Sequence, residues 1–185
     1  YPRDKIEWVI VDDGNEDVSD LLIPYRKENV KYIKVDGYKE EAMAIGKKRN
    51  MCVENCTHDY IISMDDDDYY PPESILSRVK IFAKYPEKKC VGCNEIGCYD
   101  LFGEKSYLAS DGYKYFSEAS LAFKKEFWEE RPFFDGDRKA EGKYFVQYRE
   151  KDMVNAPFQF VIIALNHKTN TSAQFRNRDM GVEND

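Results

Sequence analysis

Four consecutive carboxylates, Asp65 to Asp68, are the residues of this sequence with the clearest capacity for chemistry. Two carboxylates about 4 Å apart repel each other by about 1 kcal/mol in water and by about 4 kcal/mol at an effective dielectric constant of 20. Four of them therefore need solvent, protonation or a bound cation. Oxygen ligands suit Mg²⁺ or Mn²⁺, which complete their coordination with substrate phosphates. The alternative is a solvated acidic turn that caps the following helix.

A second candidate is an arginine on the apolar face of a helix predicted over residues 40–56. The inward positions of that helix are spaced three or four residues apart, as one helical face requires. They are Ala42, Ile45, Arg49, Cys52 and Cys56. An unpaired guanidinium on this face would be costly, so Arg49 must meet a partner. That partner is either a ligand phosphate or a carboxylate of Asp12, Asp13 or the acidic run.

Further carboxylates stand at Asp135, Asp137 and Glu141, where a helix is predicted over residues 138–149. Glu141 shares a face of that helix with aromatic core positions. A carboxylate held at a pocket wall can act as a general base. The alternative is a first-turn glutamate that the helix dipole favours.

His167 directly follows a strand predicted over residues 158–165. A histidine just past a strand end can bind a metal or contact a phosphate, and a lone histidine in a polar loop can also simply be exposed. The sequence leaves these roles open.

The elements that must position these residues alternate between strand and helix. Apolar, β-branched runs predict strands over residues 5–11, 30–35, 59–64, 89–99 and 158–165. Helices are predicted over 17–27 and 40–56, from Pro71 onward, and over 138–149. This order is typical of an α/β fold with a mostly parallel sheet and helices on both faces. Shorter aromatic runs after Leu101 indicate a smaller mixed region, with hairpin-like pieces between residues 105 and 123.

Both acidic clusters follow predicted strands, since Asp12 and Asp13 come after the first strand and the run from Asp65 after the third. Ligands of open parallel sheets sit outside the carboxyl ends of the strands. This placement favours the metal hypothesis over the acidic turn. The sequence shows no repeat or linker, so we expect one domain over residues 1–185.

The composition limits the classes of partner and the location that we expect for this chain. A net charge of −7 and a pI of about 5.1 argue against a nucleic-acid backbone as the main partner, although Lys47 to Arg49 form a short basic stretch that could hold a phosphate. No apolar run is long enough to span a membrane and no signal peptide is recognisable, so we expect a soluble, cytoplasmic chain. Cys90, Cys93 and Cys98 suggest a weak zinc hypothesis; buried, reduced thiols are the better interpretation of the five cysteines.

The sequence resembles the family 2 glycosyltransferases, which have the GT-A fold. The resemblance rests on a set of motifs in matching order and spacing: Trp8 to Gly14 (WVIVDDG), Arg49-Asn50, Tyr60 to Asp68 (YIISMDDDD) and Pro72-Glu73. The match runs from Ile6 to about Val79 and is loose after Leu101. Members of that family begin with one more strand ahead of the position of Tyr1, so by this resemblance the given sequence lacks the usual first strand. Either it is a fragment, or another segment replaces that strand.

The resemblance also implies roles. Asp12, Asp13, Arg49, Asp65 and Asp66 would bind the nucleotide sugar. Asp67 and His167 would bind the metal, with Asp68 as a possible helper. Glu141-Gly142 falls where the family usually has Glu-Asp, the site of the catalytic base, so Glu141 would serve, or Asp135 or Asp137 would substitute. Residues 1–100 would be the nucleotide-sugar half and residues 101–185 the acceptor and catalytic half, with Tyr107, Tyr113, Tyr115, Phe116 and Trp128 shaping the acceptor side.

The function implied is metal-dependent, inverting transfer of a sugar from a nucleoside-diphosphate sugar to a hydroxyl of a glycan, lipid or protein. UDP is the expected nucleotide and Mn²⁺ or Mg²⁺ the expected ion. Two alternatives remain. A nucleotidyltransferase would also hold Mg²⁺ on strand-end carboxylates, and a non-catalytic metal- or sugar-binding relative would account for glycine at position 142.

Overall fold

The computed structural model describes residues 2–25, 29–35, 43–110, 116–136 and 141–167 of the 185. The strands are β1 (Trp8–Asp12), β2 (Val30–Lys34), β3 (Tyr60–Ile62), β4 (Cys90–Gly92), β5 (Ile96–Asp100), β6 (Lys105–Ala109), β7 (Ala122–Lys124), β8 (Met153–Asn155) and β9 (Ile163–Asn166). The α-helices are α1 (Ile45–Glu54), α2 (Ser74–Lys84), α3 (Lys125–Glu130) and α4 (Glu141–Val146). Short 3₁₀ turns connect several of them: η1 (Arg3–Lys5), η2 (Ser19–Tyr25), η3 (Glu118–Ser120), η4 (Glu150–Asp152) and η5 (Phe158–Phe160).

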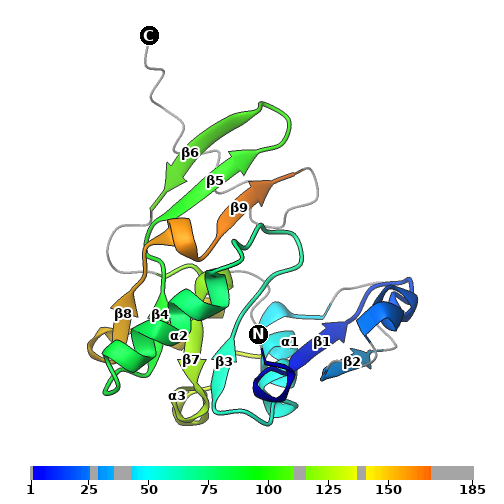
Figure 1. The fold of residues 1–185 in the computed structure, drawn as a ribbon, viewed down its shortest axis with the longest axis horizontal. Helices are drawn as coiled ribbons and strands as arrows, with labels where there is room; N and C mark the ends of the chain where they lie inside the picture. Colours follow the sequence, from blue (N-terminus) through cyan, green and yellow to red (C-terminus); the bar gives the residue numbers. More distant parts are fainter. Residues whose placement is uncertain (1, 26–28, 36–42, 111–115, 137–140, 168–185) are drawn as a thin grey trace.

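The strands form three sheets in the described part of the chain. β1 pairs with β2 in parallel, and the other sheets have the orders β3-β7-β4-β8 and β6-β5-β9. Figure 1 shows β1 and β2 to one side, with α1 between them and β3. β7 runs antiparallel to both β3 and β4, whereas β4–β8 and β5–β9 are parallel pairs. The α/β class is confirmed, but pairing is more mixed than predicted because β7 inserts between β3 and β4.

Two clusters of apolar side chains form the core. The first connects α2 to strands of both larger sheets and includes Phe82, Val91, Cys98 and Ala164. The second is aromatic and joins α1, α3 and α4 to β7. Within it, the rings of Phe133 and Phe145 stack with centroids 4.0 Å apart. Such apolar burial is the main favourable term that holds these elements together.

Three predicted elements differ from the structure. The helix predicted over residues 17–27 is the 3₁₀ turn η2, which contains Pro24, a residue that cannot donate a backbone hydrogen bond. The strand predicted over 89–99 breaks into β4 and β5, since the Cys93 amide and carbonyl bond to Ser120 Oγ and the Ser117 amide rather than to a strand. The strand predicted over 158–165 begins as η5, and only its second half forms β9.

The buried face of α1 lies one position away from the predicted stripe. Gly46, Asn50 and Val53 are buried, whereas Ile45, Arg49 and Cys52 are half-buried, and Ala42 lies outside the described residues. The difference arises because α1 packs on two sides, against β1 and against the aromatic cluster. Hydrophobic spacing alone therefore assigned the wrong face as the deepest one.

The cysteines behave as predicted, as free thiols. Cys90, Cys93 and Cys98 are buried, and burial raises the pKa of Cys93 to about 11. Among the described residues no group of cysteines is placed to hold a metal. No helix in the described ranges is long and apolar enough to cross a bilayer.

Candidate functional site

The acidic run forms a compact group of carboxylates. Asp65, Asp67 and Asp68 each offer an oxygen, and these oxygens lie within 4.8 Å of one another. Asp66 is exposed and lies outside this group. Three carboxylate oxygens at such spacing are a donor set that suits a hard divalent cation. The metal role predicted for Asp67, with Asp68 as a possible helper, is consistent with this grouping and stays a prediction.

Hydrogen bonds from distant segments hold the loop that carries the group. Tyr70 Oη accepts a hydrogen bond from the Asp65 amide at 2.7 Å and donates one to the Ala119 carbonyl at 3.1 Å. The Leu165 amide of β9 donates to Asp68 Oδ1 at 3.0 Å. β3, η3 and β9 thus all contribute to the position of the acidic run.

His167 reaches the same group from the end of β9. Its Nε2 lies 3.2 Å from Asp67 Oδ2, although 100 residues separate the two in sequence. An antiparallel bridge between Tyr69 and Ile163 sets the register that brings them together. The hypothesis that His167 and Asp67 bind the same metal ion is consistent with this placement. Carboxylates are the ligands that suit Mn²⁺ or Mg²⁺, and histidine is the commonest nitrogen ligand of metals in proteins.

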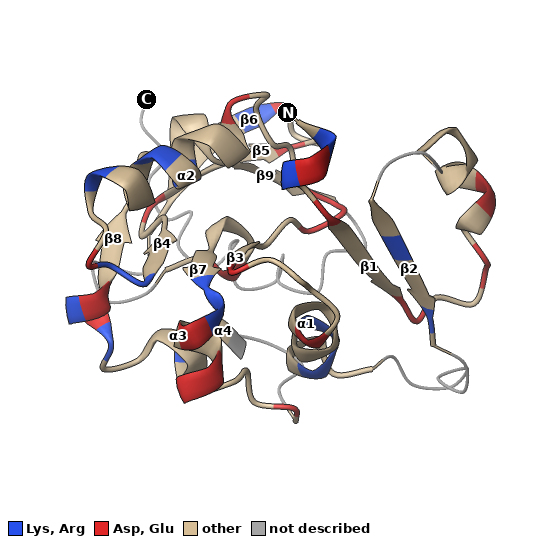
Figure 2. Cartoon of the chain, turned by 60° about the horizontal axis from the view of Figure 1, so that its bottom comes forward, with Lys and Arg blue, Asp and Glu red and all other residues tan. Residues whose placement is uncertain are grey.

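Two adjacent basic residues of α1 hold the two acidic clusters. Lys48 Nζ lies 3.0 Å from Asp13 Oδ1, and Arg49 contacts both oxygens of Asp65 at 3.0 and 3.1 Å. Figure 2 shows basic residues on the ribbon of α1, which lies between β1 and β3. Of the partners that the sequence left open for Arg49, the structure shows the carboxylate of the acidic run.

Asp12 and Asp13 have different hydrogen-bond partners. Asp12 accepts hydrogen bonds from the Gly14 amide, from Tyr32 Oη at 2.5 Å and from Lys34 Nζ at 3.1 Å. Burial alone would raise its pKa, but these hydrogen bonds outweigh it and lower the pKa. Both oxygens of Asp12 are thus used within the chain, which makes it a residue that holds the turn after β1.

Asp13 faces the other way, toward α1. It accepts hydrogen bonds from Lys48 and from the Met43 amide at 2.8 Å. Its pKa is also lowered, because these bonds outweigh the burial that would raise it. Both oxygens of Asp13 are thus also used within the chain, but by two groups rather than three, and its role as a ligand contact stays a prediction.

Asn50 is a buried polar residue whose role the sequence analysis missed. Its Nδ2 donates to the Phe133 carbonyl at 2.8 Å and to Asp135 Oδ1 at 2.7 Å. Its Oδ1 accepts from Trp128 Nε1 at 2.8 Å and from the Phe133 amide at 3.0 Å. The sequence feature that could have revealed this role is an asparagine next to Arg49, on a helix with neighbours on two of its faces.

The other candidates in the second half are placed unequally. Asp135 is exposed and held by Asn50. Asp137 lies outside the described residues. Glu141 begins α4, but its side chain is outside the described part. The structure therefore brings Asp135 to α1 and leaves the assignment of a base to Glu141 or Asp137 as a prediction.

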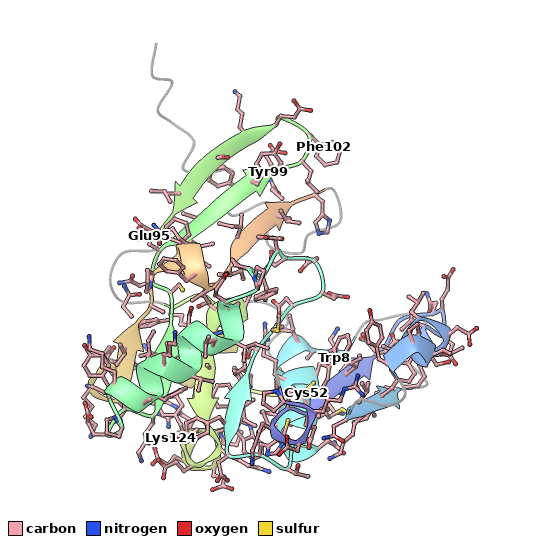
Figure 3. All side chains as sticks on the ribbon, in the orientation of Figure 1. Trp8, Cys52, Glu95, Tyr99, Phe102 and Lys124 are labelled. Atoms are coloured by element: carbon pink, nitrogen blue, oxygen red, sulfur yellow. The ribbon has the colours of Figure 1, made fainter. Side chains whose placement is uncertain are left out.

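Of the five aromatic residues predicted for the acceptor side, the structure describes three, Tyr107, Phe116 and Trp128. Phe116 and Trp128 pack against the aromatic cluster, and Tyr113 and Tyr115 lie outside the described residues. Tyr107 lines a cavity of about 470 Å³ on the β6-β5-β9 sheet. That cavity is lined by Tyr69, Gly97, Cys98, Tyr99, Ser106, Tyr107, Leu108, Phe158, Ile163 and Leu165. Figure 3 shows Tyr99 on β5 and Phe102 in the turn beyond it.

Solved structures share this architecture. The chain superposes on TarS 1–349 of S. aureus in complex with UDP-GlcNAc with a TM-score of 0.68 and 15% identity, covering 92% of this chain and 52% of TarS 1–349. It superposes on the mannosyltransferase PcManGT of Pyrobaculum calidifontis, in complex with GDP-Man and Mn²⁺, with a TM-score of 0.63 and 18% identity, covering 94% and 52%. The chain thus spans about half the length of these proteins.

No curated protein sequence matches the chain. The sequence model of glycosyl transferase family 2 matches residues 1–150, which include α1, the acidic run and α4. The structural likeness shows the GT-A fold. Since the family model covers most of the sequence, this chain belongs to glycosyl transferase family 2.

Proposed function

We propose that this chain binds a nucleoside-diphosphate sugar together with Mn²⁺ or Mg²⁺ and transfers the sugar to a hydroxyl acceptor with inversion at the anomeric carbon. The observation that carries the proposal is the meeting of Asp67, Asp68 and His167 beside the Arg49–Asp65 pair. UDP-GlcNAc bound to TarS, and GDP-Man with Mn²⁺ bound to PcManGT, support a donor of this class.

The donor would lie across the ends of β1 and β3. In this proposal Asp13 contacts the base or ribose, Arg49 lies near the diphosphate, and Asp65 with Asp66 contacts the ribose side. Asp12 acts by holding the turn, because its oxygens already accept three hydrogen bonds. UDP is the nucleotide we expect from the family resemblance.

The residues present fit a divalent cation. Asp67 and His167 would hold it, with Asp68 able to add a third donor from the same group. When bound, the ion supplies Lewis-acid stabilisation of the negative charge that builds on the departing diphosphate. Arg49, already within 3.1 Å of Asp65, adds a second positive charge on the same side of the site.

The acceptor hydroxyl, from a glycan, a lipid or a protein, needs a carboxylate to take its proton. Glu141 at the start of α4 is the residue we propose from the sequence, with Asp135 and Asp137 as alternatives. Residues 1–100 would then supply most donor contacts and residues 101–185 the acceptor side, with His167 as the metal ligand that the second half contributes.

Calorimetric titration of UDP into the protein, with and without Mn²⁺, tests the donor site. We expect binding that needs the ion and that is lost in Asp67→Ala. GDP is titrated in parallel, because the choice of base rests on resemblance alone. If neither nucleotide binds in the presence of Mn²⁺, or if Asp67→Ala binds as tightly as the wild type, the proposed donor site is wrong.

A further inference from the structure

The β6-β5-β9 sheet has a mainly apolar outward face, although a solvated sheet face usually carries polar side chains. The strand register puts six residues on this face, in two rows that cross the three strands. The rows are Leu108, Gly97 and Ile163, and Ser106, Tyr99 and Leu165. The opposite face carries Cys98 and Ala164, which belong to the first apolar cluster of the core. Apolar surface left outside the core in this way is typical of a binding site.

This outward face lines the cavity of about 470 Å³, a size typical of small-molecule sites. Phe158 of η5 covers part of the face, because a Cβ added at Gly97 would lie 2.5 Å from the Phe158 ring. Tyr69 and Leu108 also line the cavity, and they are 53% and 61% exposed. Within the described part of the chain, the cavity is therefore open to a ligand from solvent.

The cavity lies next to the acidic group. Tyr69 and Leu165 both line it; Tyr69 directly follows Asp68, and Asp68 Oδ1 accepts a hydrogen bond from the Leu165 amide at 3.0 Å. Two residues beyond Leu165 comes His167, and residues two apart in extended backbone lie on the same face. His167 Nε2 is in turn 3.2 Å from Asp67 Oδ2. The cavity face thus continues toward the residues that would hold the metal.

The chemistry of the lining selects an apolar occupant. None of the described residues that line the cavity carries a charge. The polar side-chain groups of the lining are the hydroxyls of Tyr69, Tyr99, Tyr107 and Ser106 and the thiol of Cys98. A sugar ring or a peptide buried here would leave hydroxyls or amides with few partners, and each unpaired group costs free energy. An alkyl chain has no such groups and gains free energy by leaving water.

We propose that this cavity holds an alkyl chain of the sugar acceptor, so that the polar head group to which the chain is attached lies beside Asp67 and His167. The inference rests on the proposed function. Among the glycan, lipid and protein acceptors considered there, it selects a lipid-linked one, because only that class carries a long apolar chain next to its hydroxyl groups.

Titration of the protein with a series of n-alkyl β-D-glucosides tests the cavity directly. Methyl, butyl, hexyl and octyl glucoside share one head group, and each is used below the concentration at which it forms micelles. Each CH₂ group that leaves water should tighten binding by about two- to fourfold, as measured from the NMR signals of the ligand. Methyl glucoside has no chain to bury and should bind most weakly.

Leu108→Glu puts a charge on the cavity face at an exposed position of β6, so the chain should still fold. We expect its affinity for octyl glucoside to fall at least about tenfold, because the charge would lose water when the chain binds. Leu76→Glu is the matched control, since it makes the same change at an exposed leucine of α2 outside the cavity lining. It should bind octyl glucoside within about twofold of the wild type. Thermal unfolding checks that both variants are folded.

Mn²⁺ locates the bound ligand relative to the acidic group, because its unpaired electrons speed the relaxation of nearby protons. With Mn²⁺ present, the sugar protons of octyl glucoside should relax faster than the protons of its terminal methyl group. Mg²⁺ should have no such effect. Asp67→Ala should abolish the effect of Mn²⁺ and keep the dependence of affinity on chain length.

Affinity that does not depend on chain length overturns the proposal, as does unchanged binding of octyl glucoside to Leu108→Glu. A concentration-dependent dimer that Leu108→Glu abolishes would assign the face to a second copy of the chain and also overturns it. If UDP binding needs Mn²⁺ but Mn²⁺ leaves the bound glucoside unaffected, the placement of the head group is wrong. A protein that binds neither UDP nor GDP with Mn²⁺ contradicts the donor site instead, and the chain-length series then still decides the cavity.

Discussion

Replacing Asn50 with alanine should destabilise the protein far more than its small volume implies. The Asn50 side chain makes four hydrogen bonds across α1, α3 and residues 133–135, and the residue is 7% exposed. Alanine removes all four at once. The former partners of Asn50 differ in their access to water, and that difference determines how much the free energy of unfolding falls.

The magnitude follows from which partners stay buried. Phe133 is 3% exposed, so its amide and carbonyl would both lose their partners in a place that water does not reach easily. Each unsatisfied buried group costs about 1–3 kcal/mol. Asp135 is exposed and would be rehydrated at little cost. We therefore expect a loss of about 2–4 kcal/mol in the free energy of unfolding, or roughly 5–15 °C in melting temperature for a chain of this size.

Thermal and urea unfolding of Asn50→Ala and Asn55→Ala measure the effect. Asn55 is an exposed residue at the end of the same helix. Its side-chain amide donates a hydrogen bond to the Met51 carbonyl, one turn earlier. Its replacement should change the unfolding free energy by no more than about 1 kcal/mol. If Asn50→Ala unfolds within 1 kcal/mol of Asn55→Ala, then Asn50 does not anchor residues 133–135 and the reasoning from buried donors is wrong.

Three further outcomes follow from other contacts. Gly97→Ala places a Cβ 2.5 Å from the ring of Phe158, so we expect a loss of about 1–3 kcal/mol in urea unfolding. Arg78 is fully buried and donates to the carbonyls of Ser63, which precedes the acidic run, and Leu121, which precedes β7. Arg78→Met should therefore lose about 2–4 kcal/mol by the same measurement. The pKa values of Asp12 and Asp13 lie below the ordinary 3.8, so both carboxylates stabilise the fold above that pH. The melting temperature should therefore fall as the pH drops below about 4 and stay flat between pH 6 and 8.

The sequence located the two acidic strand ends because their signals are local. An apolar strand that ends in Asp12-Asp13, and another followed by Asp65 to Asp68, mark strand ends by composition alone, and helices were predicted where α1 and α2 lie. The prediction that Asp67 and His167 come together also agrees with the structure, although it rested on the family resemblance. Spacing in sequence carries no information on a contact that spans 100 residues.

The remaining features depend on contacts that no local pattern encodes. β7 lies between β3 and β4 because its apolar residues Ala122 and Phe123 are buried on both faces, and three residues are too few to show a period. The interruption at Cys93 follows from a bond to Ser120 Oγ, 27 residues away. Asn50 was missed for the same reason, since its partners are 78 to 85 residues distant.

Three consecutive residues of α1 connect the parts of the candidate site. Successive residues of an α-helix point about 100° apart, so Lys48, Arg49 and Asn50 necessarily aim in three directions. They reach Asp13 after β1, Asp65 after β3, and the segment that ends in Asp135. A helix can serve all three only if it lies between them, and the burial of Gly46 and Val53, about two turns apart on α1, fixes it there. The distance between the two acidic clusters and the segment that ends in Asp135 is therefore set by the position of α1. Under the proposed function, any substitution that moves α1 should alter donor binding and sugar transfer together.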